Sequence, residues 1–309
     1  MKSNELPLAN MRDLFGDHLQ ENVVMANYTT AHVGGPAVGL LPINSLKELE
    51  QAARALWKLN VPFKIIGSGA NVLFSDRGYE GVVLVNHAHT IKINYHTASP
   101  GVWAESGANL GAIARQSALR GLSGLEWAAT IPGTLGGAVY GNAGAQGLDI
   151  AGTLNSVEIL MRNGEKQVWN TDRLSFQYRS SILKRDHSDA VILSGKFDLI
   201  PGDLKTIQSR MEEFSHKRRL SQPPGASMGS TFKNPPDDFA GRLIEASGLK
   251  GKRVGDVEVS PQHANFFVNT GHATAQDYFE LIKLVQKKVA QQTGIKLELE
   301  IELVGDFGE

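Results

Sequence analysis

Apolar residues recur at helical spacing in five segments of the chain. The clearest segment follows Ser45 and Glu48, which fit a capping box, and it carries one apolar face. Start and stop signals predict four more helices, at residues 109–120, 204–220, 239–247 and 274–293. The last of these helices begins with a second capping pair, Thr274 and Asp277.

Short apolar or alternating runs predict strands at residues 64–66, 72–74, 82–85, 90–105, 157–161, 166–169, 191–199 and 265–269. Together with the helix after Ser45, the strands at residues 64–66 and 82–85 suggest a β-α-β unit over residues 38–85. From Ile295 to Leu303, apolar and charged residues alternate strictly, which predicts one half-buried strand. Its outward face carries Glu298, Glu300 and Glu302, and the pattern does not choose among these glutamates.

Two glycine-rich segments are the most informative candidates for a binding site. Residues 131–144 (IPGTLGGAVYGNAG) contain five glycines and no charged side chain, and Gly67–Asn71 (GSGAN) follows an apolar run. Glycine lets the main chain approach a ligand closely, and free N–H groups in such turns bind anions. The pair suggests a phosphate-bearing cofactor held mainly by main chain. Two ordinary tight turns are the alternative.

The standard nucleotide and hydrolase motifs are absent. Gly67 and Gly69 begin a GxGxxG fingerprint, but Val72 stands where its third glycine would be, and a strand-like run follows. The sequence contains no P-loop and no HExxH, and no GxSxG at a plausible strand–helix turn. A Rossmann domain, a metal-dependent site and a serine hydrolase are therefore disfavoured.

Two polar segments are candidates for substrate binding or catalysis. Gly229–Pro235 (GSTFKNP) combines two hydroxyls, a cation and an amide, a set that can hold an anionic substrate and donate a proton. Tyr178–Ser181 (YRSS) contains Arg179, whose guanidinium can pair bidentately with a carboxylate. The plainer alternatives are a turn with a solvated lysine and a surface arginine.

Composition limits the class of protein. The 309 residues are 41% hydrophobic and 20% charged, carry a net charge of −1 and include no cysteine. These values are typical of a globular protein of two or three domains, and they exclude disulfides and thiol catalysis. The sequence shows neither a signal peptide nor a run of 18 apolar residues, so we expect no membrane span. The charge gives no sign of a nucleic-acid partner.

The ordered motifs of the chain together resemble the UDP-N-acetylenolpyruvoylglucosamine reductase family (UDP-N-acetylmuramate dehydrogenases). The resemblance extends from about Thr29 to Gly305, and the joint order and spacing of the motifs make it specific. Besides the segments above, it rests on TAHVGGPA (30–37), the extension of the glycine-rich segment to Gly147, AGRLIEASGLKG (240–251), VSPQHANFFVNT (259–270) and the glutamate-bearing last strand. The chain lacks the tyrosine-bearing insertion of one subtype and so resembles the shorter one.

This resemblance implies an α+β fold. We expect an FAD-binding domain of two α/β subdomains, like that of the vanillyl-alcohol oxidase (PCMH-like) flavoproteins, at residues 1–88 and 89–203. A C-terminal α/β substrate-binding domain is expected at residues 204–309. The implied ligands are non-covalent FAD, NADPH as reductant and UDP-N-acetylglucosamine enolpyruvate as substrate. The resemblance further implies a cytoplasmic monomer of peptidoglycan precursor synthesis, with no metal, nucleic-acid or membrane partner.

The same resemblance assigns the candidate site residues. Expected catalytic residues are Arg179, Ser230 and Glu300, and expected substrate-binding residues are Tyr178, Lys233 and Asn234. Cofactor contacts are expected at Gly67, Ser68, Gly69, Ala70, Asn71, Ile131, Pro132, Gly133, Gly136, Gly137, Gly141 and Asn142. In the family's reaction, hydride passes from NADPH to FAD and then from N5 to C3 of the enolpyruvyl group, and Ser230 is the expected proton donor to C2.

Three positions depart from the family's pattern: Gln146, Asp256 and Glu302. A second carboxylate at Glu302 would raise the pKa of Glu300 if the two lie close together. Two alternatives to the reductase are a related FAD-dependent alcohol or lactone oxidoreductase and a non-catalytic nucleotide-sugar-binding protein. The GSTFKNP segment and Glu300 argue against the oxidoreductase, and the three catalytic positions argue against the binding protein.

Overall fold

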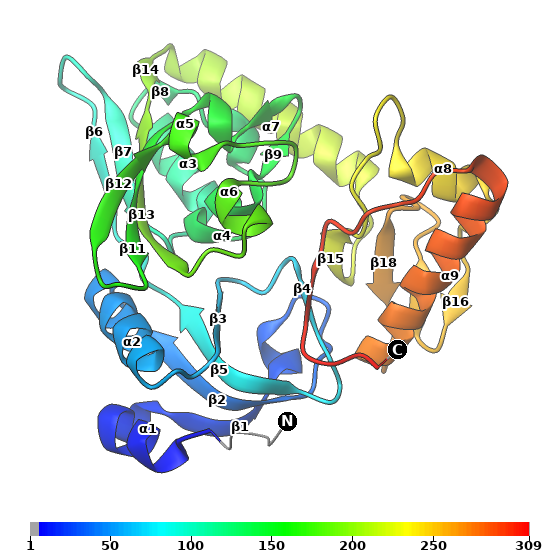
Figure 1. Ribbon diagram of the computed structural model, residues 1–309. Coiled ribbons are helices and arrows are strands. Elements are labelled where there is room, and N and C mark those ends of the chain that lie inside the picture. Colours follow the sequence, from blue (N-terminus) through cyan, green and yellow to red (C-terminus); the bar gives the residue numbers. More distant parts are fainter. Residues whose placement is uncertain (1–5, 309) are drawn as a thin grey trace. The chain divides into compact units, whose positions relative to one another are not determined.

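The computed structural model describes residues 6–308, which form two compact units (Figure 1). Both units are discontinuous in sequence. The first contains the chain up to residue 19 together with residues 41–67 and 83–218, and the second contains residues 20–40, 68–82 and the chain from residue 219 onward. Each unit has its own hydrophobic core.

The first unit contains a five-stranded antiparallel sheet with the order β12-β11-β13-β7-β6. Its strands are β6 (Ile91–Asn94), β7 (Gly101–Glu105), β11 (Leu154–Met161), β12 (Lys166–Asn170) and β13 (Ala190–Asp198). The predicted strands of this region are confirmed, although the run over 90–105 is two strands. Two helices pack against the sheet (Figure 1), α3 (Leu110–Ala118) on β7 and α4 (Leu135–Gly141) on β13.

Apolar side chains between this sheet and its helices form the core of the first unit. Trp127 and Phe197 are at most 2% exposed, and Leu135 and Val139 bury one side of α4. Complete burial of an aliphatic side chain of this size contributes about 1.5–3 kcal/mol to stability. Helix α3 also begins as predicted, because Asn109 Oδ1 accepts the N–H of Ala112 (2.9 Å).

Helix α2 (Leu46–Lys58) also belongs to the first unit, and Ser45 caps it as predicted. Glu48 Oε2 accepts the N–H of Asn44 (2.8 Å) and not that of Ser45, so only one half of the predicted capping box forms. Ser45 Oγ accepts the N–H of Glu48 (3.2 Å), and Leu49 and Leu56 are buried. The buried carboxylate of Glu105 in β7 joins α2 to the five-stranded sheet. It accepts the N–H groups of Leu46 (3.0 Å) and Thr90 (2.8 Å). Burial raises the pKa of Glu105, but these hydrogen bonds outweigh burial and hold that pKa below its ordinary value of 4.5.

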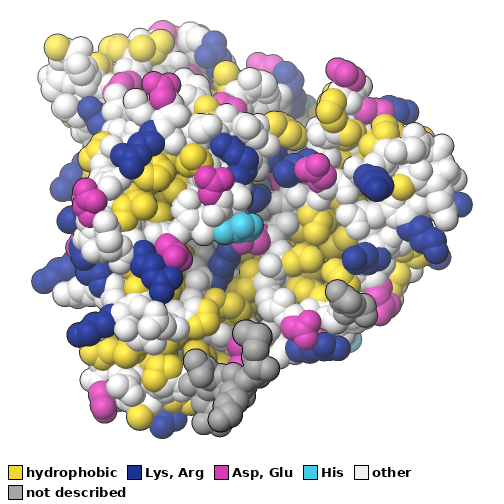
Figure 2. Space-filling view, in the orientation of Figure 1, with side chains coloured by type: hydrophobic (Ala, Val, Ile, Leu, Met, Phe, Trp, Pro, Cys, Tyr) yellow, Lys and Arg dark blue, Asp and Glu magenta, His cyan; other side chains and the backbone are white. Residues whose placement is uncertain are grey.

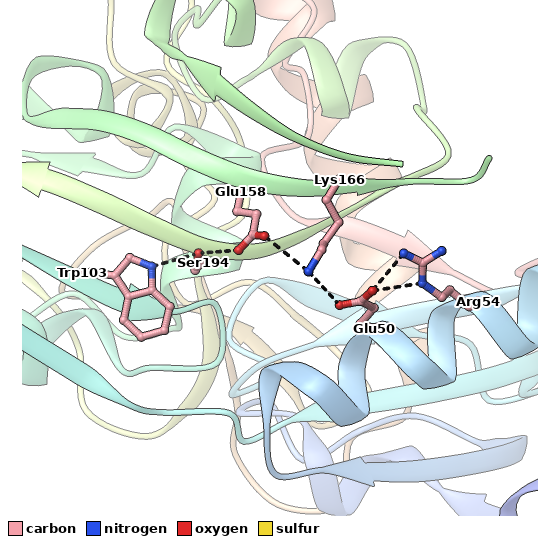
Figure 3. A network of polar contacts seen from close by, with 6 residues as sticks. All are labelled: Glu50, Arg54, Trp103, Glu158, Lys166 and Ser194. Atoms are coloured by element: carbon pink, nitrogen blue, oxygen red, sulfur yellow. Dashed lines mark hydrogen bonds and ion pairs between the residues drawn. The ribbon is translucent and has the colours of Figure 1, made fainter. Parts of the chain in front are cut away.

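A chain of polar side-chain contacts also connects α2 to the five-stranded sheet (Figure 3). Lys166 Nζ lies 3.3 Å from Glu50 Oε2 and 3.7 Å from Glu158 Oε1, and Arg54 also binds Glu50. Ser194 Oγ donates to Glu158 Oε2 (3.4 Å) and accepts the indole N–H of Trp103 (3.1 Å). Side chains rather than main-chain ladders therefore connect these elements.

A further four-stranded sheet has the order β1-β2-β5-β3. Its strands are β1 (Gln20–Val24), β2 (Pro36–Ile43), β3 (Phe63–Ile66) and β5 (Tyr79–Asn86). Strands β1 and β2 pair antiparallel within the second unit, with Gln20 opposite Leu40. Strand β2, helix α2 and strand β3 follow one another along the chain in the predicted β-α-β order.

The second unit contains an antiparallel sheet with the order β15-β18-β17-β16. Its elements are β15 (Ala226–Ser230), α8 (Ala240–Ala246), β16 (Arg253–Val254), β17 (Val257–Val259), β18 (Phe266–Asn269) and α9 (Ala275–Thr293). Helix α9 has the predicted capping box of Thr274 and Asp277. Asp76, from a distant part of the chain, accepts two further N–H groups at the start of α9, from Ala275 (3.0 Å) and Gln276 (2.8 Å).

Two sequence predictions are wrong, at residues 295–303 and 131–144. The strand expected over residues 295–303 is mostly irregular, and only β19 (Glu302–Val304) forms, in parallel with β4 (Val72–Phe74). Leu297 and Ile301 are nevertheless buried, so the alternation reported burial and not strand pairing. The glycine-rich segment 131–144 is not a loop throughout, because α4 forms in its middle and ends at Asn142 in the left-handed conformation (φ 45°).

The remaining elements are α1 (Leu8–Phe15), α5 (Thr171–Leu174), α6 (Ile182–Arg185), α7 (Leu204–Ser221), β8 (Leu122–Ser123), β9 (Gly144–Ala145), β10 (Leu148–Asp149), β14 (Ile200–Pro201) and the 3₁₀ turns Gly16–His18, Met25–Tyr28, Glu126–Ala128 and Ile150–Gly152. No helix within residues 6–308 combines the length and apolar character that crossing a membrane requires. On the face in Figure 2, Lys and Arg side chains are interspersed with Asp and Glu, as the net charge of −1 leads one to expect.

Candidate functional site

The GSGAN segment (Gly67–Asn71) packs tightly against its neighbours at two glycines, Gly67 and Gly69. A Cβ on Gly67 would lie 2.3 Å from Thr134 Oγ1, so the two glycine-rich segments touch within the first unit. A Cβ on Gly69, in the second unit, would lie 2.0 Å from the carbonyl oxygen of Tyr28, and its φ of +64° also favours glycine. Thr30 N–H in turn donates to the carbonyl of Gly69 (3.2 Å). Close main-chain approach therefore explains both glycines.

Main-chain N–H groups in both glycine-rich segments are available to an anion. Among the described residues of the second unit, none accepts a hydrogen bond from the N–H groups of Ser68, Gly69, Ala70 and Asn71. The same holds within the first unit for the N–H groups of Gly133, Thr134 and Gly137, and a Cβ on Gly133 would meet no atom within 4 Å. Such groups suit the oxygens of a diphosphate.

Other predicted cofactor residues already use their polar groups inside the protein. The N–H of Gly136 donates to the carbonyl of Ser106 (2.7 Å), and that of Ile131 donates to Ala128 (3.1 Å). Asn142 is 3% exposed, and its side-chain amide bonds to three protein groups, which are Asp149 Oδ2, the carbonyl of Gln177 and the N–H of Ala151. The amide of Asn142 therefore belongs to the internal framework of the first unit.

Arg179 lies at the second central position of a tight turn in the first unit. Gln177 and Ser180 exchange both main-chain hydrogen bonds, at 2.9 and 3.1 Å. The φ of Arg179 is +53°, a conformation that costs a residue with a side chain about 1–2 kcal/mol relative to the usual region. Its Nη2 donates to the carbonyl of Gly144 (2.8 Å), and Tyr178, 52% exposed, lies beside its guanidinium. Strain of this kind is typical of functional positions.

In the second unit, the segments that carry Ser230 and Glu300 are adjacent. The N–H of Glu300 donates to the carbonyl of Thr231 (2.9 Å), and the N–H of Lys233 donates to the carbonyl of Glu298 (2.9 Å). Both Ser230 and Glu300 are half-buried. Main-chain pairing therefore brings together two predicted catalytic residues that are 70 positions apart in the chain.

Asn71 connects the GSGAN segment to the same place. Its Nδ2 donates to the carbonyl of Glu300 (3.1 Å), and its own carbonyl accepts the N–H of Glu302 (2.9 Å). Both bonds lie on the C-terminal side of Glu300, so Asn71 holds the chain directly after that residue. A predicted cofactor segment and a predicted catalytic residue are neighbours in the second unit.

The structure distinguishes the three glutamates that the alternating pattern left equivalent. The side chain of Glu298 is 77% exposed and forms an ion pair with Lys233 (3.3 Å). Glu302 is half-buried near Tyr79, and burial together with the Glu302 charge raises the pKa of Tyr79 to about 12. Glu300 lies between Thr231 and Asn71.

Asn265 is not among the predicted site residues, yet it holds the segment after Ser230. This residue is 3% exposed, its Oδ1 accepts the N–H of Phe232 (3.0 Å), and its Nδ2 donates to the carbonyl of Phe232 (2.8 Å). Its carbonyl also accepts the N–H of Thr231 (2.8 Å). An Asn directly before the apolar run 266–268 was the available signal, but its partner is more than 30 residues away. The amide of Asn234 has a local task too, since its Oδ1 accepts the N–H of Ala240 at the start of α8 (3.0 Å).

One departure from the family's pattern has a structural explanation. Asp256 Oδ2 accepts the N–H of His272 (2.7 Å), and its carbonyl accepts the N–H of Thr270 (2.9 Å). The residue therefore closes a turn of the second unit. Gln146 has a φ of +57° in the exposed turn between β9 and β10.

Comparisons with known proteins cover nearly the whole chain. The family model described as "UDP-N-acetylenolpyruvoylglucosamine reductase, C-terminal domain" matches residues 220–304, and the model described as "FAD binding domain" matches residues 39–168. The reductase of that name from Chloroflexus aggregans is 40% identical over 289 residues, which cover 93% of this chain and 97% of the relative. The Rubrobacter xylanophilus reductase is 43% identical over 284 residues, which cover 91% and 94%.

A solved structure supports the same assignment. The crystal structure of UDP-N-acetylenolpyruvylglucosamine reductase from Thermus caldophilus matches with a TM-score of 0.78 and 35% identity, over 92% of this chain and 98% of that one. The expected α+β class, with an FAD-binding domain and a distinct C-terminal domain, is confirmed. The chain therefore belongs to the UDP-N-acetylenolpyruvoylglucosamine reductase family, the FAD-dependent oxidoreductases of peptidoglycan precursor synthesis that its motifs resemble.

Proposed function

We propose that Ser230, Arg179 and Glu300 carry out the reduction of UDP-N-acetylglucosamine enolpyruvate to UDP-N-acetylmuramate, with NADPH as the reductant. The observation that carries the proposal lies in the second unit, where the N–H of Glu300 donates to the carbonyl of Thr231, the residue after Ser230, and Asn71 Nδ2 donates to the carbonyl of Glu300. Arg179 adds a strained, half-buried guanidinium from the first unit.

FAD is the cofactor of the family, and its fit can be judged from the main chain. The N–H groups of Ser68–Asn71 and of Gly133, Thr134 and Gly137 donate to no described residue of their own unit, and they are suited to the diphosphate. When bound, FAD accepts hydride from NADPH and supplies it to C3 of the enolpyruvyl group. The residues of this chain then stabilise the negative charge that develops at C2 and on the substrate carboxylate, and they protonate C2.

Each catalytic side chain has a task that its chemistry allows. Arg179 offers a cationic, planar fork that matches a carboxylate. Ser230 donates the proton to C2, and as a weak acid it requires a strongly basic carbon or a relay. Glu300 assists only when it is protonated or paired, because a bare carboxylate would repel the substrate.

Three further residues complete the proposed substrate site. Tyr178 offers an exposed ring beside Arg179, while Lys233 and Asn234 belong to the same GSTFKNP segment as Ser230. Lys233 Nζ is paired with the exposed Glu298, so an anionic substrate would have to compete with that carboxylate. The expected cytoplasmic location and monomeric state belong to this proposal, and light scattering of the holoenzyme tests the monomer.

The alternative of an alcohol or lactone oxidoreductase has less support. The family model for the reductase's C-terminal domain matches residues 220–304, which include Ser230 and Glu300. A non-catalytic binding protein is likewise disfavoured, because the three proposed catalytic residues sit in ordered, half-buried surroundings.

The variant Ser230→Ala tests the proton-donor role. We expect flavin reduction by NADPH to be nearly unchanged, whereas reoxidation by the enolpyruvyl sugar slows by on the order of 10²–10⁴-fold, the usual contribution of a general acid. Stopped-flow absorbance at the flavin bands separates these half-reactions. Ser227→Ala on the same strand is the matched control and should leave both rates intact. Equal slowing of both half-reactions in Ser230→Ala would reject the role.

A further inference from the structure

The turn that carries Arg179 is attached to the end of α4 by three side-chain hydrogen bonds, all within the first unit. Asn142 Nδ2 donates to the carbonyl of Gln177 (3.0 Å), Arg179 Nη2 donates to the carbonyl of Gly144 (2.8 Å), and Ser181 Oγ donates to the carbonyl of Tyr140 (2.7 Å). All three partners on the α4 side lie within residues 140–144. The turn is therefore docked onto one short stretch of chain.

The bond from Asn142 acts on the group that closes the turn. The carbonyl of Gln177 accepts the N–H of Ser180 (3.1 Å) and the amide of Asn142, so both of its lone pairs are used. Arg179 lies between Gln177 and Ser180 in this turn, and its φ of +53° must be enforced by the surrounding structure. Loss of the Asn142 bond removes one of the constraints that enforce it.

Asn142 is itself fixed in orientation. Its Oδ1 accepts the N–H of Ala151 (3.2 Å), and the second hydrogen of its Nδ2 is donated to Asp149 Oδ2 (3.0 Å). The amide cannot flip without breaking all three bonds. Asp149 in turn caps the following 3₁₀ turn through the N–H of Gly152 (3.2 Å). Asn142 therefore transmits the position of this framework to the Arg179 turn.

We infer that Asn142 is a positioning residue for Arg179, acting through its hydrogen bond to the carbonyl of Gln177. The inference rests on the proposed role of Arg179 in binding the substrate carboxylate. It predicts that loss of this one bond impairs the substrate half-reaction and spares the reduction of the flavin by NADPH. Misplacement of a catalytic group by about 1 Å costs on the order of 10²-fold in rate.

A double-substitution cycle separates positioning from stability. In Asn142→Asp, oxygen replaces the donor and faces two acceptors, so we expect a lower melting temperature and slow reoxidation by substrate. Asp149→Asn is the matched control: its one remaining oxygen can accept from Asn142 or from Gly152 but not from both. In either case the Gln177 bond remains, so the melting temperature falls while reoxidation stays within about threefold of the parent. The double variant restores an Asn–Asp pair with reversed polarity. It should recover melting temperature but not the reoxidation rate, because position 142 still lacks a donor for Gln177.

Asn142→Gly covers the case in which Asn142→Asp does not fold. Glycine suits the left-handed helix end, so α4 still terminates, but the amide is gone. We expect slow reoxidation, a raised KM for the enolpyruvyl sugar and normal flavin reduction. Reoxidation that recovers in step with melting temperature in the double variant would overturn the inference, as would a normal rate in Asn142→Gly. If Arg179→Ala itself reoxidises at the normal rate, the proposed role of Arg179 fails, and that variant alone shows it.

Discussion

The two regions that supply the proposed catalytic groups are built differently. Around Ser230 and Glu300, main-chain hydrogen bonds connect the segments, through Thr231, Lys233 and their partners. Around Arg179, the connection to α4 depends on the side chains of Asn142, Arg179 and Ser181. A region joined by main chain tolerates most substitutions, whereas a region joined by side chains can be lost by one. We therefore expect the Arg179 region to be the more sensitive to mutation.

Among the variants that test the difference between the two regions, Arg179→Lys is expected to change the rate of reoxidation most. An ammonium group keeps the charge but can reproduce neither the planar fork nor the bond to Gly144 in the same geometry. We expect reoxidation by substrate to slow by about 10²–10³-fold, as when one donor to a developing charge is removed. Stopped-flow measurement of both half-reactions checks this. A rate within threefold of the parent would show that charge alone suffices at this position.

The variant Asn265→Ala tests the region joined by main chain. Two hydrogen bonds to Phe232 disappear in a buried setting, so we expect the free energy of unfolding to fall by about 2–4 kcal/mol. The pairing of Thr231 with Glu300 remains, so reoxidation should change less than tenfold. Denaturation followed by circular dichroism and stopped-flow kinetics supply the two values. Thr231→Val is the control, because it preserves the β-branched shape and every main-chain bond. A loss of rate as large as that of Asn142→Gly would erase the distinction between the two regions.

A smaller loss of stability is expected at Glu105, whose side chain connects α2 to the five-stranded sheet of the first unit. Glu105→Gln weakens the bonds to Leu46 and Thr90, and we expect the free energy of unfolding at pH 7 to fall by about 1–2 kcal/mol. Because the pKa of Glu105 is lowered in the folded protein, its stabilising contribution is present above the ordinary value of 4.5. That contribution is lost as pH falls through the folded-state pKa.

The difference between the parent and Glu105→Gln should therefore shrink as the pH is lowered below about 4.5. Tryptophan fluorescence is a suitable probe, because all four tryptophans lie in the first unit. A difference that stays constant from pH 7 to pH 3 would contradict the assigned role of the carboxylate.

The helices could be predicted from local pattern, and the residues show why. Ser45, Asn109 and Thr274 cap helices through their own neighbours in the chain, so the signal and its partner lie within three residues. The strand over 295–303 failed because its pattern records which side chains are buried, while a strand also needs a paired backbone beside it. In α4, Leu135 and Val139 are buried against the sheet, and this packing outweighs the low helix propensity of the glycines.

The candidate site divides along the same line. Motif order alone determined the family, the flavin cofactor and the identity of the residues to examine, because residue types and spacing are written in the chain. Only the tertiary structure decided that Asn71 donates to the carbonyl of Glu300, that Asn265 binds the main chain of Phe232 and that Asn142 holds the Arg179 turn. Each of these contacts joins segments more than 30 residues apart, and a hydrogen bond requires a distance near 3 Å that no linear pattern encodes.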